Sequence, residues 1–197
     1  MNIALFGGAF NPIHIAHTLL AKRAMNEFSV DKVIFMPTYI SPHKNTTKSV
    51  SYQHRMNMVR LATEDEDNFL VSDYESKIEG NSYSYLTLKH LKKDYPHDKL
   101  FLIVGADMYI SLLKWKNPQI IFELCDIITC PRDEENYNSL LEYSKILENH
   151  SCVSHIMKKP VMMLSSTIIR ENPRLSYEKG FLDKKVFDYI IRHNLYT

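Results

Sequence analysis

The fold of this 197-residue chain is decided by the stretch Gly7-Gly8-Ala9-Phe10-Asn11-Pro12-Ile13-His14-Ile15-Ala16-His17. It follows the short apolar run Ile3–Phe6 and leads into Ile15–Phe28, where apolar residues recur at helical spacing. The two glycines let the backbone turn sharply and approach a ligand closely, because they carry no Cβ. A strand, a glycine turn and a helix are therefore predicted at the start of the chain.

The alternation of strand and helix continues along the chain. Segments with helical spacing, such as Ile15–Phe28 and Ser51–Thr63, lie between short β-rich runs. Alternation at about thirty residues per unit is typical of βαβ crossovers, so the sequence predicts an α/β fold with a doubly wound, mostly parallel Rossmann-like sheet and helices on both faces. The predicted strands are Ile3–Phe6, Lys32–Met36, Phe69–Val71, Lys99–Val104, Asp126–Thr129 and Val161–Leu164.

Two polar segments are predicted to be loops. Pro37–Val50 contains prolines, serines and threonines, and Pro131–Asn138 is rich in charged residues. Neither is long enough to link two domains. Together with a composition of 45% hydrophobic and 24% charged residues, this indicates one globular domain over residues 1–197.

The composition excludes several classes of protein. The formal net charge is +1, so no strong positive field marks a protein that coats nucleic acid. Cys125, Cys130 and Cys152 are an odd number without metal-ligand spacing, which argues against a disulfide framework or a protein-held metal and is typical of thiols in a reducing cytoplasm. No apolar run approaches the ~20 residues of a membrane span. We expect a cytoplasmic protein that binds neither nucleic acid nor membrane, and the sequence leaves a homo-oligomer open.

The start of the Ile15–Phe28 segment has the features of an anion site. The first N–H groups of a helix are unpaired and carry the positive end of its dipole, so they attract phosphate. His14 and His17 lie on one face of this first turn, and each ring can donate an N–H to a phosphate oxygen. Taken alone, two nearby histidines and a glycine pair are as often structural as ligand-binding.

A second anion site is predicted at Ser165-Ser166-Thr167, which follows the last predicted strand and opens a short helical segment. Arg170 lies one turn further and can form two hydrogen bonds with a phosphate. The alternative is a well-capped helix with a solvated arginine. Lys44, in the proline-containing loop, can swing over phosphates or remain a solvated loop lysine.

In this order along the chain, these segments resemble the nucleotidyltransferase superfamily whose hallmark is a His-x-Gly-His sequence after the first strand. The resemblance is specifically to the bacterial nicotinate mononucleotide adenylyltransferases. Further matching segments run along almost the whole chain. They are Ser41-Pro42-His43-Lys44, His54-Arg55-Met56, Asp73-Tyr74-Glu75, Gly80-Asn81-Ser82-Tyr83-Ser84, Val104-Gly105-Ala106-Asp107 with Trp115 downstream, Ser165-Ser166-Thr167-Ile168-Ile169-Arg170, and Tyr189-Ile190 with Leu195-Tyr196.

Four positions depart from the family pattern. Ala9 stands where Thr or Ser is common, and Asn11 stands where Asp is usual, which removes a charge but keeps an acceptor. Ala16 replaces the glycine of the hallmark motif, and Ala is favourable inside a helical turn. Leu86 stands where an acidic residue is frequent. The departures leave the role of an acid at position 11 open.

The resemblance implies a role for each matching residue. His14, His17, Lys44 and Arg170 are expected to be catalytic, by positioning and charge stabilisation. We expect ATP to be bound by Gly7, Gly8, Ala9, Phe10, His14, His17, Gly105, Asp107, Ser165, Ser166, Thr167, Ile169 and Arg170. We expect the mononucleotide to be bound by Asn11, Lys44, Tyr83, Ser84, Trp115 and Arg132.

The residues themselves leave two of these roles open. Trp115, the only tryptophan, can stack on a pyridine ring or serve as a partly buried structural residue. Asp107 can accept from ribose hydroxyls or cap a helix. The resemblance favours the ligand-binding role of Trp115.

The implied reaction moves AMP from ATP to nicotinic acid mononucleotide and releases pyrophosphate, as a late step in making NAD. The C-terminal part, about residues 165–197, is expected to complete the ATP site. We expect Mg²⁺ to be carried with ATP, because the sequence offers no cluster of carboxylates suited to an all-protein site.

Two alternatives remain open. One is another adenylyl- or cytidylyltransferase of the superfamily, with nicotinamide mononucleotide or phosphopantetheine as acceptor. The Tyr83-Ser84 and Trp115 segments argue against it. The other is a non-catalytic nucleotide-sensing module, which has no reason to keep His14, His17 and Arg170 together.

Overall fold

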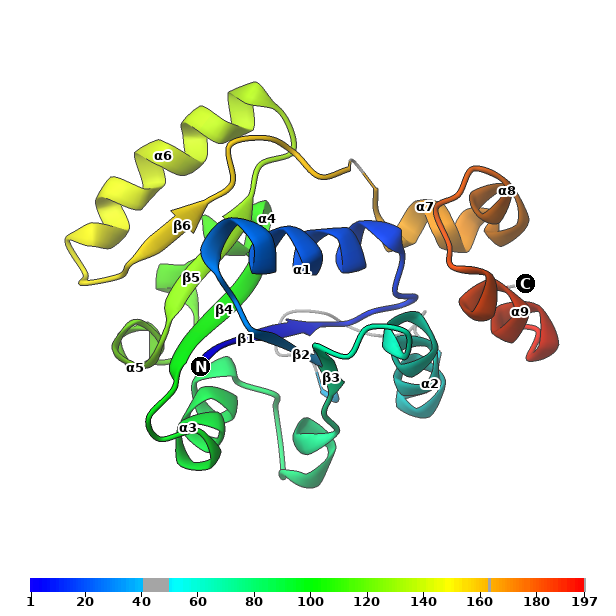
Figure 1. The fold of residues 1–197 in the computed structure, drawn as a ribbon, viewed down its shortest axis with the longest axis horizontal. Coiled ribbons are helices and arrows are strands. Elements are labelled where there is room, and N and C mark those ends of the chain that lie inside the picture. The colour runs from blue at the N-terminus through cyan, green and yellow to red at the C-terminus, as the bar shows by residue number, and fades with distance from the viewer. Residues whose placement is uncertain (41–49, 163, 197) are drawn as a thin grey trace.

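The protein folds around a six-stranded sheet in which every neighbouring pair of strands is parallel (Figure 1). The computed structural model describes residues 1–40, 50–162 and 164–196. The strand order is β3-β2-β1-β4-β5-β6, which confirms the predicted doubly wound Rossmann-like sheet. The strands are β1 (Asn2–Gly8), β2 (Lys32–Pro37), β3 (Phe69–Val71), β4 (Lys99–Gly105), β5 (Asp126–Cys130) and β6 (Ser154–Ile156).

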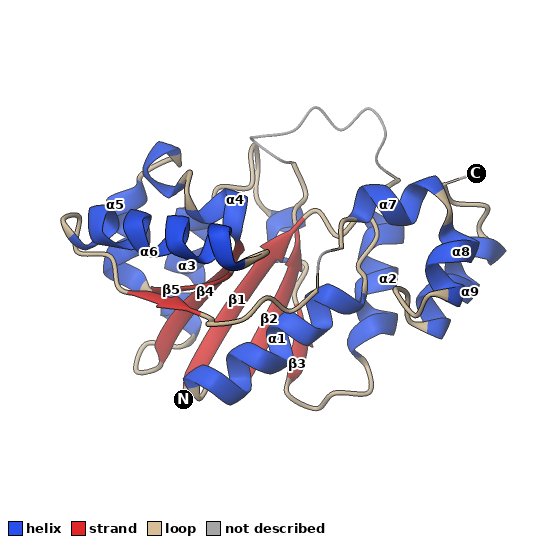
Figure 2. Cartoon of the chain, turned by 90° about the horizontal axis from the view of Figure 1, so that it is seen from above, coloured by secondary structure: helices blue, strands red, loops and turns tan. Residues whose placement is uncertain are grey.

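Helices cover both faces of the sheet (Figure 2). The α-helices are α1 (Ile15–Phe28), α2 (Tyr52–Thr63), α3 (Ser84–Asp94), α4 (Ala106–Tyr109), α5 (Pro118–Leu124), α6 (Glu134–Glu148), α7 (Ser166–Glu171), α8 (Pro173–Glu178) and α9 (Lys184–Arg192). Two short 3₁₀ turns are η1 (Tyr74–Lys77) and η2 (Leu112–Lys114).

Two separate cores form because successive residues of a strand point to opposite faces. Phe6 and Phe35 enter the core beneath α1, α2 and α9. Leu5 and Ile34 enter the core beneath α3, α5 and α6. Burial on both faces explains why the strands are almost continuously apolar in sequence.

The predicted strand Val161–Leu164 is wrong. Strand β6 is formed by Ser154–Ile156, which pairs in parallel with β5. Val161 and Leu164 lie outside any strand and pack, partly buried, against the core beneath α1. Burial without strand pairing gives the same apolar signal as a buried strand, and the three-residue β6 is too short and polar to stand out. Ser165 therefore follows a loop.

The predicted loop Pro131–Asn138 is shorter than expected, because α6 begins at Glu134. The charged residues of this segment form the start of that helix. Asp133 is the N-cap, and its carboxylate accepts from the backbone N–H of Asn136 at 2.7 Å. The acidic first turn also complements the helix dipole. In the other predicted loop, Pro37 is the last residue of β2, and residues 41–49 lie outside the described part of the chain.

The strand order reverses at β1, which lies between β2 and β4. In open parallel sheets, such a switch point is where ligands bind, beyond the carboxyl ends of the strands. Gly7 and Gly105 lie at these ends of β1 and β4. The C-terminal helices return beside α2 (Figure 2), so residues from both ends of the chain meet near the loop that follows β1.

Candidate active site

The loop after β1 is held by hydrogen bonds to its backbone carbonyl groups. Each of these carbonyls accepts from a residue distant in sequence, so their partial negative charges are already paired with donors. The donors and acceptors are Thr38 N to Gly8 O at 2.8 Å, Arg55 Nη1 to Ala9 O at 2.7 Å, Arg170 Nη1 to Asn11 O at 2.7 Å, and Ser166 Oγ to Pro12 O at 2.9 Å. The loop is thus fixed from behind by β2, α2 and α7.

Phe10 explains one of the two glycines. Its φ is 44°, in the left-handed region, and its ring packs into the core against Phe6 and Phe35. A Cβ at Gly8 would lie 3.3 Å from the Phe10 ring, closer than ordinary contacts. Glycine at position 8 therefore lets the chain fold the Phe10 side chain under the loop, where it is 2% exposed.

His14 and His17 form a stacked pair at the start of α1. Their ring centroids are 3.7 Å apart, and His14 is the N-cap residue of the helix. The backbone N–H of His14 donates to Nδ1 of His17 at 3.2 Å. Because Nδ1 of His17 accepts, its ring proton is on Nε2, which can donate to a ligand.

Both histidines are neutral at pH 7. Burial lowers the pKa of His14 to about 4. Burial, and then the neighbouring His14, lower the pKa of His17 well below the value of a free imidazole. The pair can therefore contribute hydrogen-bond donors to a phosphate, but not fixed positive charge.

The depressed pKa of His14 makes the protein less stable in acid. Between pH 6.5 and about 4, the unfolded state takes up a proton at His14 and the native state does not. The free energy of unfolding should therefore fall as the pH drops through this window, by about 3 kcal/mol from this group. Urea unfolding at a series of pH values should show a shallower decline for His14→Gln than for the wild type. His97→Gln, at an exposed histidine, is the control, and identical slopes for His14→Gln and wild type would contradict the assignment.

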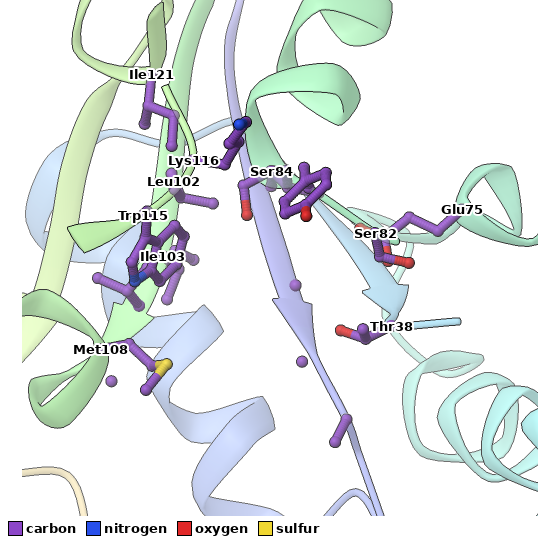
Figure 3. A pocket seen from close by; sticks show the side chains of 17 residues that line it. Thr38, Glu75, Ser82, Ser84, Leu102, Ile103, Met108, Trp115, Lys116 and Ile121 are labelled. Carbon is purple, nitrogen blue, oxygen red and sulfur yellow. The ribbon is translucent and has the colours of Figure 1, made fainter. Parts of the chain in front are cut away.

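A first cavity, of about 210 Å³, lies on the α3 side of the β1 end, and we call it the tryptophan cavity. Trp115 and Ser84 lie on facing sides of it (Figure 3). Trp115 Nε1 donates to the Ser111 hydroxyl at 3.2 Å, which fixes the edge of the indole. Ser84 is the first residue of α3, after the N-cap Tyr83. Other lining residues include Gly7, Gly8, Ala9, Thr38, Glu75, Tyr83, Lys116, Gly105 and Met108.

A second cavity, of about 330 Å³, lies over the start of α1, and we call it the histidine cavity. His14 and His17 line one side of it, and Ser165 and Ser166 approach from the start of α7. The Ser165 hydroxyl accepts from the backbone N–H of Ile168, as an N-cap does. Other lining residues include Gly105, Ala106, Asp107, Met108, Pro131 and Arg132.

The two cavities adjoin, because Gly105 and Met108 line both of them. Gly105 ends β4, so the contact lies at the switch point of the sheet. Two ligands bound in these cavities would meet there. This adjacency is the main chemical feature of the site.

Some predicted residues lie elsewhere than expected. Gly7, Gly8 and Ala9, expected to bind ATP, line the tryptophan cavity. Arg132, expected beside the mononucleotide, lines the histidine cavity and forms an ion pair with Asp107.

Three other predicted residues take part mainly in internal contacts. Asn11 lines neither cavity, since it is 8% exposed and its side-chain oxygen accepts from the Tyr196 hydroxyl at 2.7 Å. The Ile169 side chain is fully buried in the core. Arg170 donates to the Asn11 carbonyl and, at 3.0 Å, to the Thr167 hydroxyl. Lys44 lies outside the described residues.

The structure adds site residues to which the sequence analysis gave no role. Glu75 lines the tryptophan cavity, is 5% exposed, and accepts from the Thr87 hydroxyl at 3.2 Å. Burial raises its pKa, although hydrogen bonds from Ser82 and Thr87 oppose this. Lys116 also lines this cavity. The sequence signals for these two residues were the matching segment Asp73-Tyr74-Glu75 and the position of the lysine directly after Trp115.

In the part of the chain that the structure describes, no group of three or more His, Cys, Asp or Glu side chains is placed to hold a metal ion. No described helix is both long and apolar enough to cross a bilayer. Cys125, Cys130 and Cys152 are free thiols.

Two adjoining ligand cavities at the switch point of a Rossmann-like sheet, one of them lined by a helix start with a histidine pair, are features of a nucleotide-binding α/β protein. The sequence model of the cytidylyltransferase-like family matches residues 5–172. A protein of Lachnoclostridium phytofermentans that is named "Probable nicotinate-nucleotide adenylyltransferase" is 33% identical over 196 residues, covering 98% of both chains. A protein of Clostridium tetani with the same name is 35% identical over 195 residues, again 98% of both.

Solved structures agree on the fold. The nicotinic acid mononucleotide adenylyltransferase of Plasmodium falciparum complexed with NaAD superposes with a TM-score of 0.78 at 20% identity, over 99% of this chain and 97% of that one. The same enzyme complexed with APC gives a TM-score of 0.76. The chain belongs to the cytidylyltransferase-like family and, within it, to the nicotinate-nucleotide adenylyltransferases.

Proposed function

We propose that this protein transfers AMP from ATP to nicotinic acid mononucleotide, producing nicotinic acid adenine dinucleotide and pyrophosphate for NAD biosynthesis. The observation that carries the proposal is the adjacency of the tryptophan and histidine cavities, which share Gly105 and Met108. A reaction that joins two nucleotides needs both reacting phosphates at one place. The full-length similarity to nicotinate-nucleotide adenylyltransferases supports the same reaction.

ATP occupies the histidine cavity in this proposal. The start of α1, His14 and His17 face its phosphates, and the hydroxyl groups of Ser165 and Ser166 add further donors. Asp107, exposed and paired with Arg132, lies where a carboxylate can accept from ribose hydroxyls. That ion pair rearranges when the ribose binds.

Nicotinic acid mononucleotide occupies the tryptophan cavity. Its pyridine ring stacks on Trp115, and its carboxylate faces the start of α3 at Ser84. Its phosphate points toward Gly105, where the two cavities meet.

The chemistry needs no nucleophile from the protein. A phosphate oxygen of the mononucleotide attacks the α-phosphorus of ATP, the bond from that phosphorus to the oxygen bridging the β-phosphorus breaks, and pyrophosphate leaves. The attacking phosphate is already ionised near neutral pH, so a general base is unnecessary. The protein contributes alignment and N–H donors, with His17 Nε2 and the start of α1 directed at the charge that is redistributed in the transition state.

Magnesium enters with ATP as part of the substrate in this proposal. Residues 1–40, 50–162 and 164–196 hold no cluster of three or more His, Cys, Asp or Glu side chains suited to a metal ion. Asp107 is the carboxylate nearest to such a role, since it lines the histidine cavity. The role of Lys44 as a further positive charge beside the ATP phosphates stays a prediction, because this residue lies outside the described part of the chain.

The resemblance implies that Arg170 also donates to the ATP phosphates, beyond its bonds to the Asn11 carbonyl and the Thr167 hydroxyl. On this prediction Arg170→Ala should mainly raise the KM for ATP, by roughly tenfold, because hydrogen bonds to a charged phosphate contribute at least about 1.5 kcal/mol. A guanidinium on the triphosphate binds ground state and transition state alike, so kcat should change less. Arg170→Lys should raise the KM for ATP less than Arg170→Ala does, because an ammonium keeps the charge but not the two-bond geometry of a guanidinium. Steady-state kinetics against ATP measure this, with Arg174→Ala on the exposed side of α8 as the matched control. An unchanged KM would restrict Arg170 to its bonds with the Asn11 carbonyl and the Thr167 hydroxyl.

A pyrophosphate-release assay separates the proposed function from its alternatives. Purified protein is given ATP or CTP with nicotinic acid mononucleotide, nicotinamide mononucleotide or phosphopantetheine. The proposal expects the highest rate with ATP and nicotinic acid mononucleotide. A higher rate with CTP or with phosphopantetheine would assign a different transferase, and nucleotide binding without pyrophosphate release would indicate a sensing module.

A further inference from the structure

Arg55 lies behind the site, on the first turn of α2, and lines neither cavity. It is 5% exposed, which is rare for an arginine. Its guanidinium donates from Nη1 to the carbonyl of Ala9 at 2.7 Å and from Nη2 to the carbonyl of Thr38 at 2.8 Å. One planar group thus joins the residues that follow β1 and β2.

Both acceptors belong to the wall of the tryptophan cavity, because Ala9 and Thr38 line it (Figure 3 labels Thr38). Ala9 also belongs to the loop that leads into the histidine pair. Arg55 therefore links the loop that leads to the histidine cavity with the wall of the tryptophan cavity. A backbone hydrogen bond from Thr38 to Gly8, at 2.8 Å, joins the same two segments and does not depend on Arg55.

The surroundings favour an arginine at this place. Burial lowers the pKa of Arg55, and the nearby Glu75 carboxylate opposes this effect. The guanidinium carbon also lies 5.4 Å from the centre of the Tyr52 ring, a cation–π contact that favours the charged form. A flat group with several N–H donors can reach both carbonyls, one after β1 and one after β2, at the same time. A lysine ammonium has the charge but not this geometry.

We propose that Arg55 is a positioning residue for adenylyl transfer: it sets the distance between the loop after β1 and the wall of the tryptophan cavity, and so aligns the two substrates. The inference rests on the proposed function. Arg55 touches neither substrate, so its removal should change alignment more than binding.

The test uses the full-length protein with Arg55→Lys. We expect kcat to fall about tenfold, because a point charge cannot hold both carbonyls and a small misplacement slows a positioned reaction. The Kd for nicotinic acid mononucleotide should stay within about twofold, since the ring and carboxylate contacts remain. Trp115 is the only tryptophan and lines the cavity, so quenching of its fluorescence reports this Kd without turnover.

Arg60→Lys is the matched control, because Arg60 lies on the same helix and is exposed. It should leave kcat unchanged. The second variant is Arg55→Ala, assayed with millimolar guanidinium ion, far below denaturing concentrations. Free guanidinium should occupy the vacated space and restore part of kcat.

A kcat within twofold of wild type for Arg55→Lys would overturn the proposal. So would a parallel loss of kcat and mononucleotide affinity, which indicates a general structural role, or the absence of guanidinium rescue in folded Arg55→Ala. Failure of the proposed function looks different: the wild type itself would then form no dinucleotide, and the positioning role would fall with it.

Discussion

His17→Ala should lower kcat by about 10²–10³-fold, the range typical of removing one donor aimed at charge in a transition state. Nε2 of His17 carries the ring proton, because Nδ1 accepts from the His14 backbone. His17 lines the histidine cavity, where we place the α-phosphate. Binding of nicotinic acid mononucleotide in the other cavity should change much less, since His17 does not line it.

Steady-state kinetics together with Trp115 fluorescence separate these two effects. Circular dichroism of the variant checks that the fold is intact, and His97→Ala, at an exposed histidine, is the control. The same substitution at His14 tests whether the stacked rings act as a pair. Comparable kcat values for folded His17→Ala and wild type would remove His17 from the mechanism.

The enzyme should prefer nicotinic acid mononucleotide over its amide by about 10- to 150-fold in kcat/KM, since a hydrogen bond to a charged group contributes roughly 1.5–3 kcal/mol. The acid's carboxylate faces the start of α3 and the Ser84 hydroxyl. The oxygen of the neutral amide is a weaker acceptor for these hydrogen bonds. The NH₂ group of the amide is itself a donor, so it cannot bond to the donors that face it. Equal values would contradict the acid-specific assignment while leaving adenylyl transfer intact.

Two variants divide this preference into its parts. Trp115→Ala should weaken the binding of both the acid and the amide mononucleotide. It should leave the ratio of their kcat/KM values nearly unchanged, because stacking recognises the face of the ring and not the acid group. Lys116→Met should lower the ratio, because Lys116 lines the tryptophan cavity and its positive charge favours the acid. Lys114→Met, at an exposed lysine outside the cavity lining, is the control and should leave the ratio unchanged.

The sequence predicted most of the fold because the sheet is buried on both faces. Lys32–Met36 and Lys99–Val104 each fall within one residue of an observed strand, and Ile15–Phe28 matches α1. The error at Val161–Leu164 has a definite cause. Periodicity reports burial, and a loop that packs on a core is as apolar as a strand.

The site could be predicted only in part, because its geometry depends on contacts distant in sequence. The local patterns indicated two helix starts that can bind anions, and both line the histidine cavity. They could not reveal that Arg55 reaches Ala9 across 46 positions, or that Tyr196 reaches Asn11 across 185. A polar residue in a ligand loop has the same sequence signal whether its side chain faces the ligand or a distant hydroxyl.

The central claim is the transfer of the adenylyl group, and the most direct measurement follows the α-phosphorus of ATP. Protein is incubated with ATP labelled with ³²P at the α-position, magnesium and nicotinic acid mononucleotide, and the products are separated. We expect the label in nicotinic acid adenine dinucleotide, with one unlabelled pyrophosphate released for each dinucleotide formed. Label that remains in ATP, or that appears only in AMP through hydrolysis, would contradict the account.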